Sequence, residues 1–192
     1  LESITFPPNI TEIGWDCLRG TSKLSIDISL PKLKVAGADS FSGSGITKIT
    51  NLGSLTAIPT RFANGCKNLT EVVLPAQCIE LSNSSFSGCT SLSSINLEHV
   101  TNIGDYSFQN CSALAIEINL PSLNSLGIAA FSSSGITSIT SLGNIIKVPN
   151  FSSCKSLVSV DLGDSNIEEF DYNAFANCTA LETVNFLSND KN

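Results

Sequence analysis

Apolar residues recur along the chain with a long, regular period. Each repeat opens with an aliphatic residue, has a second apolar residue three or four positions later, and then a Leu or Phe, as in Leu92, Ile95 and Leu97. Successive openings lie 21 to 24 residues apart, which gives eight full repeats and the start of a ninth. The opening residues are Leu1, Leu24, Ile46, Leu69, Leu92, Leu114, Ile136, Leu157 and Leu181. Self-similarity at this period is the sequence signature of a solenoid.

Three short elements are predicted within each repeat. The opening predicts a strand, because alternate apolar positions with β-branched residues are typical of a half-buried strand. A second apolar segment follows, and Gly or Pro marks a turn directly after it, as in Ile103-Gly104. The small residues that precede an aromatic, as in Ser107-Phe108, favour one helical or 3₁₀ turn.

Stacking is required because one such repeat cannot bury its own apolar face. The predicted fold class is therefore a mainly β solenoid of the α/β type, a single domain over residues 1–192. Its parallel strands, from Leu1–Phe6 to Leu181–Phe186, are expected to form one curved sheet with little regular helix. Since the last repeat leaves an apolar face uncovered, we expect the chain to be a fragment of a longer protein.

A longer duplication lies within the array. Residues 24–59 match residues 114–149 at a constant offset of 90 positions. Four repeats, which open at Leu24, Ile46, Leu114 and Ile136, have one additional residue before the last apolar residue of the predicted strand. The shifted residues are Leu30, Leu52, Leu120 and Leu142. The shift predicts a bulge or a change of register in these strands.

The charge composition of the chain disfavours some classes of binding partner. Only 14% of the residues are charged, and 10 Lys and Arg stand against 17 Asp and Glu, for a net charge of −7. An acidic chain has no electrostatic footprint for phosphate backbones or anionic lipid, so nucleic acid is not expected as a partner. No apolar stretch approaches the roughly 18 residues of a membrane span.

The complete repeat signature resembles a known family. Leu92-x-x-Ile95-x-Leu97 is followed by Ile103-Gly104 and by Ser107-Phe108-x-x-Cys111. This pattern resembles the BspA-like, or Treponema-type, leucine-rich repeats, and it extends from Leu1 to Phe186. The resemblance implies a right-handed leucine-rich-repeat superhelix on cell-surface or secreted proteins of bacteria or protists, which mediate adhesion and binding to host proteins. The copies at 1–23 and 136–156 depart most from the pattern.

The cysteines form a periodic set. Five of the seven lie three residues before the next repeat opening, and Gly43 and Ser133 hold the corresponding position in two other repeats. A small buried hydrophobe explains this slot better than a metal centre, because no paired Cys/His spacing is present. Cys17 and Cys78, outside this set, are also expected to pack internally. The five periodic residues are Cys66, Cys89, Cys111, Cys154 and Cys178.

Catalytic chemistry is not predicted. His99 is the only His, and its position after a strand indicates an exposed loop rather than a general base. Glu71, Glu117 and Asp161 fall on different strands, too far apart for a catalytic pair. We therefore expect no enzyme activity, no cofactor and no metal.

The outward strand positions are the predicted binding surface. They form a polar ladder on the expected concave side, and its most directional side chains lie near the middle of the array. The predicted ligand-binding residues are Glu71, Asn96, Glu117 and Asn119. A rival surface is the turn edge around Trp15, Tyr106 and Tyr172. We expect protein binding or adhesion to host or extracellular proteins, with a structural spacer or a carbohydrate-binding module as the alternatives.

Overall fold

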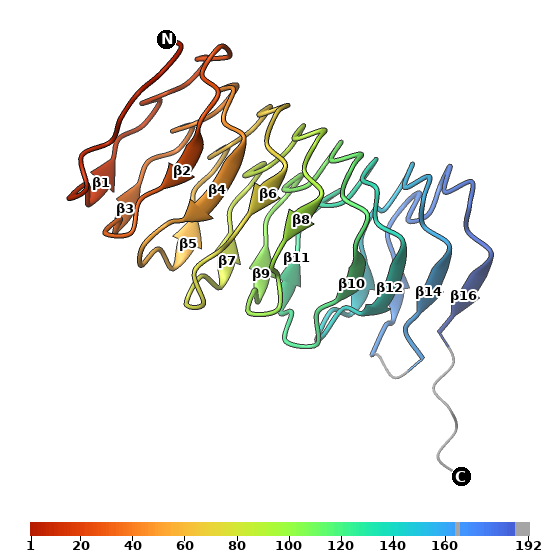
Figure 1. Ribbon diagram of the computed structural model, residues 1–192. Helices are drawn as coiled ribbons and strands as arrows, with labels where there is room; N and C mark the ends of the chain where they lie inside the picture. The colour runs from red at the N-terminus through yellow and green to blue at the C-terminus, as the bar shows by residue number, and fades with distance from the viewer. Residues whose placement is uncertain (164–165, 187–192) are drawn as a thin grey trace.

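The protein is a parallel β-solenoid. The computed structural model describes residues 1–163 and 166–186, and it shows the repeats stacked in chain order from β1 to β16 (Figure 1). Within these residues sixteen short strands lie in two rows, with the even-numbered strands in a first row and the odd-numbered strands in a second. All strand pairs within these residues are parallel, as stacking predicts.

The first row derives from the repeat openings. It consists of two sheets of four strands rather than the single curved sheet predicted, because β8 and β10 do not pair. The predicted strand at Leu1–Phe6 is also absent from the structure. The strands are β2 (Asp27–Ser29), β4 (Lys48–Asn51), β6 (Glu71–Val72) and β8 (Ser94–Ile95), then β10 (Glu117–Asn119), β12 (Ser138–Ser141), β14 (Ser159–Asp161) and β16 (Thr183–Asn185).

The second row derives from the second apolar segment, for which the sequence predicted only a turn to follow. Each strand here has two residues, one of them directed inward in most repeats. The pairing again divides the row into separate sheets. The strands are β1 (Glu12–Ile13) and β3 (Val35–Ala36); β5 (Ala57–Ile58), β7 (Glu80–Leu81), β9 (Asn102–Ile103) and β11 (Ser125–Leu126); and β13 (Lys147–Val148) and β15 (Glu169–Phe170).

The shifts before Leu52 and Leu142 are β-bulges, as predicted, whereas in the repeats of Leu30 and Leu120 the additional residue lies between the repeat opening and Ile28 or Ile118. In the β2–β4 pair, Ile28 is opposite Ile49 but Ser29 is opposite Asn51, so Thr50 is the extra residue. The β10–β12 pair repeats the same irregularity 90 positions later. A bulge of this kind leaves one residue unpaired and keeps the following apolar side chain directed inward.

The small-residue segments form hydrogen-bonded turns, and the described residues contain no helix, which corrects the helical or 3₁₀ turn predicted there. These turns are bonded to the next repeat as well as to themselves: the Phe41 amide donates to the Phe62 carbonyl at 2.8 Å and the Phe108 amide to the Ala130 carbonyl at 2.7 Å. Pairing with the neighbouring repeat satisfies the backbone groups that a short isolated helix would leave free.

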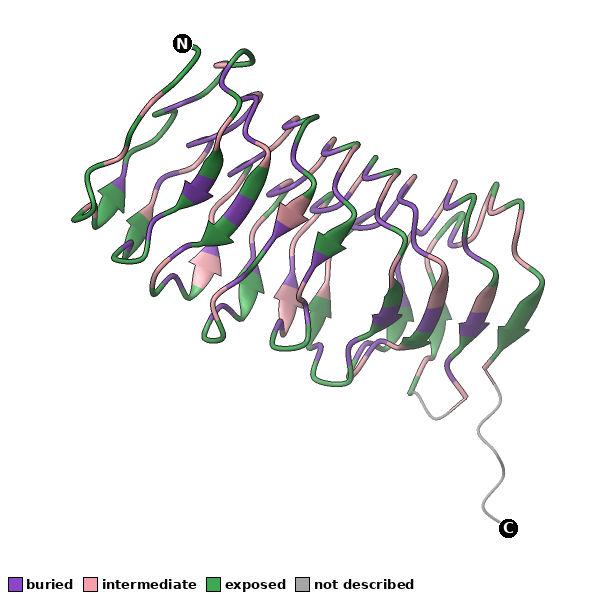
Figure 2. Cartoon of the chain, in the orientation of Figure 1, coloured by how far each residue is buried: buried purple, intermediate pink, exposed green. Residues whose placement is uncertain are grey.

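The core is a set of columns running along the solenoid. Figure 2 shows the alternation in the first row, with buried residues flanked by exposed ones on β2 and β4. The aromatic column has ring centroids 5.0 to 6.5 Å apart, each pair contributing about 0.5–1.5 kcal/mol beyond burial. It consists of Phe41, Phe62, Phe86, Phe108, Phe131, Phe151 and Phe175. Phe151 completes the column even though its repeat is the shortened one.

Candidate functional site

The outward residues of the first row form one polar surface, which we name the ladder face. Many of its side chains are already bonded to the neighbouring repeat. Lys48 on β4 makes an ion pair with Glu71 on β6 at 2.9 Å, and the Glu71 carboxylate raises the pKa of Lys48. Glu71, predicted as a binding residue, therefore has its carboxylate occupied by a partner within the ladder.

Asn96 is also occupied, and by the backbone. Its Oδ1 accepts a hydrogen bond from the Leu74 amide at 2.7 Å, and its Nδ2 donates to the Leu74 carbonyl at 3.0 Å. One side-chain amide thus binds both polar groups of a residue in the preceding repeat. We name this arrangement the Asn96 clamp. Because Leu74 is 3% exposed, the clamp satisfies backbone groups that little solvent reaches.

The ladder is interrupted after β8. Within the continuous sheet, the Ser93 and Ser94 amides both donate to the Thr70 carbonyl, at 3.0 and 3.3 Å. In the next repeat the corresponding amides bond within their own repeat instead of to the preceding one. The Ala115 amide donates to the Ala113 carbonyl at 2.9 Å, and the Ile116 amide donates to the Leu114 carbonyl at 3.0 Å. The cause is one additional residue, since three residues separate Leu114 from Ile118 where two separate Leu92 from Ile95.

A cavity lies at this interruption, between two repeats that stay joined through their turns and second-row strands. Its volume is about 200 Å³, and we name it the junction cavity. It is lined by Ile95, Leu97, Glu98, Ile116, Glu117, Ile118, Asn119 and Leu120. The floor is therefore aliphatic, and two carboxylates and one amide stand on it.

Unpaired backbone groups also face the junction cavity. Alternate residues of a strand direct their N–H and C=O groups to opposite neighbours. The Ile116 carbonyl accepts from Thr137 on the β12 side, so Glu117 and Asn119 direct their backbone groups toward β8. By the same alternation Ile95 directs its own toward β10. No strand pairing joins β8 and β10 in this fully described part of the chain.

The four predicted binding residues thus fall into two pairs. Glu71 and Asn96 are held in the continuous ladder, whereas Glu117 and Asn119 line the junction cavity. Glu117 accepts a hydrogen bond from Thr140, and the Asn119 side chain makes no hydrogen bond to any described residue. Glu98 was not predicted. The signal that could have identified this place was the additional residue before Leu120.

The rival aromatic surface is not a cluster. Trp15 is 80% exposed and follows β1, while Tyr172 is 85% exposed and follows β15, near the opposite end of the solenoid (Figure 1). Tyr106 lies between them in the chain and is 39% exposed. These side chains are accessible, as predicted, but they present three separate positions.

The periodic cysteines form a thiol column without the features of a metal centre, and four of them are buried while Cys178 is half-buried. Each thiol donates to a carbonyl of the preceding repeat, as Cys111 does to Phe86 at 3.2 Å. Burial raises the pKa of Cys111 to about 12 and that of Cys78, outside the column, to about 11. No group of His, Cys, Asp and Glu within the described residues could hold a metal ion.

Two expectations about this column are corrected. Ser44 and Ser134, not Gly43 and Ser133, take the thiol position in the repeats without Cys, because the Ser44 Oγ lies 3.4 Å from the Cys66 Sγ and Ser134 bonds Cys154 in the same way. Gly43 and Ser133 precede them and have positive φ angles of 65° and 57°. Cys17 is exposed and is not a packing residue.

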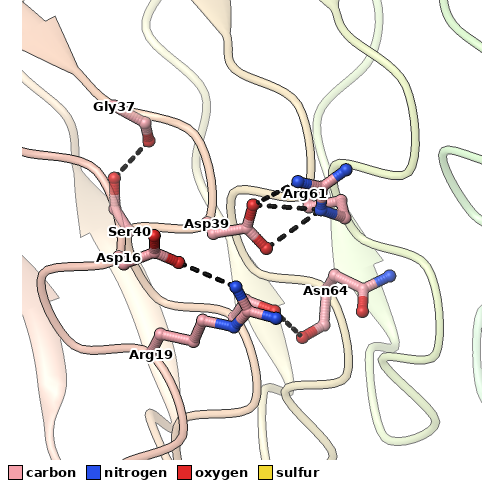
Figure 3. A network of polar contacts seen from close by, with 8 residues as sticks. Asp16, Arg19, Gly37, Asp39, Ser40, Arg61 and Asn64 are labelled. Atoms are coloured by element: carbon pink, nitrogen blue, oxygen red, sulfur yellow. Dashed lines mark hydrogen bonds and ion pairs between the residues drawn. The ribbon is translucent and has the colours of Figure 1, made fainter.

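A charged network lies on the turn edge between the second row and the small-residue turns (Figure 3). The Arg61 guanidinium donates three hydrogen bonds to the Asp39 carboxylate, at 2.6 to 3.0 Å, and these bonds hold the pKa of Asp39 below its ordinary value. Asp39 is 4% exposed, so the pair compensates the burial of a charge. Its role is therefore structural. His99 is exposed, as predicted, and its Nε2 lies 3.9 Å from the Glu98 carboxylate.

Comparison with known proteins agrees with this architecture. The chain is similar to the crystal structure of a leucine-rich repeat protein from Treponema pallidum, at 20% identity and a TM-score of 0.66, over 94% of this chain and 78% of that one. It is also similar to a leucine-rich repeat protein from Bacteroides ovatus, at 23% identity and a TM-score of 0.61, over 92% of this chain and 58% of that one. No curated protein sequence matches it.

Within the described residues, no helix is long and apolar enough to cross a membrane.

The model of the BspA type leucine rich repeat region matches residues 1–115 and 83–192, which together span the whole chain. The period, the columns and the fold agree with this match, and the chain therefore belongs to the BspA-type leucine-rich repeat family.

Proposed function

We propose that the chain is a non-catalytic protein-binding module that acts at a cell surface or after secretion, in adhesion to host or extracellular proteins. The observation that supports this most is the ladder face, where polar side chains are held at regular spacing by bonds between repeats. A surface that is already ordered loses little conformational entropy on association, so a larger share of its contact energy is retained as affinity.

The ladder face is a better candidate than the turn edge. Binding energy concentrates in a contiguous centre surrounded by contacts that exclude water. The junction cavity supplies such a centre in the middle of the first row, with aliphatic side chains beneath polar ones. The exposed aromatics Trp15 and Tyr172 follow β1 and β15, the first and last strands of the second row, so one partner would have to extend along the solenoid to contact both.

The alternative of a carbohydrate-binding module has less support. A cavity of about 360 Å³ lies between the small-residue turns and the next repeat openings, and it is lined by Ser112, Ser133, Ser134, Gly135, Ser153, Lys155 and Ser156. Hydroxyl groups can bond a sugar, but this lining lacks the aromatic face on which a pyranose ring stacks. A spacer remains the other alternative, and it requires no ligand.

An array experiment tests the proposal. The purified chain is applied to arrays of purified extracellular matrix proteins and of glycans. Saturable binding to one or more proteins is the expected result; binding to glycans only, or to nothing, would contradict the proposal. A ladder variant (Glu71→Gln, Glu117→Gln, Asn119→Ala) is then compared with an aromatic variant (Trp15→Ala, Tyr106→Ala, Tyr172→Ala). We expect loss of binding in the ladder variant, and full binding by it would exclude this face.

A further inference from the structure

We propose that the junction cavity binds an extended segment of a partner protein by its main chain, next to a Lys or Arg side chain of that segment. This inference rests on the proposed function and names the chemistry of its partner. Three independent observations carry it: the free amide of Asn119, the unpaired backbone groups of β8 and β10, and the two carboxylates at the cavity.

The Asn96 clamp shows how this column of the ladder binds a main chain. Asn96 and Asn119 hold the same place in their repeats, directly before the last Leu of the strand. Asn96 bonds the N–H and the C=O of one residue in the preceding repeat at 2.7 and 3.0 Å. Asn119 has the same two groups, but the additional residue in its repeat separates it from the preceding strand. Its amide is therefore free to bond a peptide unit that is not part of this chain.

The backbone adds further bonding groups on the same side. Glu117 and Asn119 on β10, and Ile95 on β8, direct N–H and C=O groups into a region where no strand pairs. An extended segment can bond such groups as an added strand does, because main-chain bonding depends on the geometry of the backbone rather than on its side chains. The aliphatic floor favours an apolar residue of that segment beside the clamped one.

Charge selects the neighbouring side chain. Glu98 and Glu117 both line the cavity, and the chain carries a net charge of −7. His99 is the basic residue adjoining Glu98, with its Nε2 3.9 Å from the carboxylate, and Thr140 is the partner of Glu117. A Lys or Arg of the segment would add a charge-assisted bond to either carboxylate. The volume of about 200 Å³ is below the roughly 300–1,000 Å³ of a pocket for a drug-sized ligand, so only one or two residues of the segment would enter the cavity.

Peptide titration tests this directly. The probes are capped synthetic peptides of alternating Lys and Val, the same peptide with Glu in place of Lys, and the Lys peptide N-methylated on alternate backbone nitrogens. Each is titrated into the isotope-labelled 192-residue chain while the side-chain NH₂ resonance of Asn119 is followed. We expect saturable shifts with the Lys peptide, and weak or no shifts with the Glu peptide and with the N-methylated peptide.

Variants separate this site from general acidity. Asn119→Ala removes two neutral hydrogen bonds and should raise the Kd of the Lys peptide about tenfold. In Asn119→Ala, binding is followed by the backbone amide resonances of Ile95 and Glu117. The matched control is Asp27→Asn with Ser29→Ala, the positions 90 residues earlier in the duplicated block, which should leave the Kd unchanged.

Each outcome has one meaning. No saturable binding of the Lys peptide, an equal Kd for the Glu peptide, or an unchanged Kd in Asn119→Ala would overturn the junction site. The protein array decides the proposed function separately: an array partner that binds Asn119→Ala at full affinity refutes the junction site and leaves protein binding intact. An empty array with no peptide binding refutes both.

Discussion

Replacing Asn96 by Ala tests whether the ladder face is held together by side-chain bonds to the backbone. The variant removes both bonds of the Asn96 clamp, at 2.7 and 3.0 Å, and leaves the Leu74 N–H and C=O without partners. A neutral hydrogen bond contributes about 1 kcal/mol net, and an orphaned buried group costs about 1–3 kcal/mol. Because Leu74 is 3% exposed, we expect a decrease of about 2 kcal/mol in the free energy of unfolding.

The measurement is urea unfolding followed by far-ultraviolet circular dichroism, because Trp15 is exposed and is a weak fluorescence reporter of the fold. The midpoint should fall while the slope stays the same, which indicates a change of stability alone. Asn119→Ala is the matched control, since it removes the same side chain at an exposed position without a bonded partner, and it should change stability by no more than about 0.5 kcal/mol. Equal effects of the two substitutions would refute this account of the ladder.

Three further predictions concern other parts of the solenoid. Thiol titration at neutral pH should label Cys17 rapidly and the thiol column only after unfolding, and rapid labelling of all seven thiols in the native protein would contradict this. Because burial raises the pKa of Cys111 to about 12 from an ordinary 9.0, the free energy of unfolding should decrease as the pH rises above about 9. The Arg61→Gln substitution should lower the melting temperature at neutral pH. Because the guanidinium lowers the pKa of Asp39 from its ordinary 3.8, this effect should fade as the pH falls below 3.8; an effect that persists in acid would indicate lost packing rather than lost charge. Amide hydrogen exchange should be fast at Asn119 and slow at Val73, which holds the same place in the continuous ladder and donates to the Ile49 carbonyl at 2.7 Å; equal protection would mean that β8 and β10 pair in solution.

Most of the architecture could be predicted because burial is encoded locally. A residue that packs inward in every repeat is apolar in every repeat, so the period alone placed the first-row strands from β2 onward, most of the aromatic column and the bulges near Leu52 and Leu142. The second-row strands were missed as strands because two residues are too short to show an alternation. The predicted helical turns were wrong because small residues before an aromatic suit either conformation, and bonds to the next repeat decide between them.

The binding residues could be chosen from sequence only as a class of outward polar positions. Asn96 and Asn119 occupy identical places in their repeats, and nothing in either repeat alone shows that one binds the backbone while the other is free. Whether a strand is paired depends on the register between two repeats, and one additional residue before Ile118 was enough to break it. The sequence by itself thus determined which side chains face the core and which family the chain resembles. The tertiary structure decided which outward groups remain available, because a hydrogen bond between repeats requires the two partners to lie directly opposite each other in neighbouring strands.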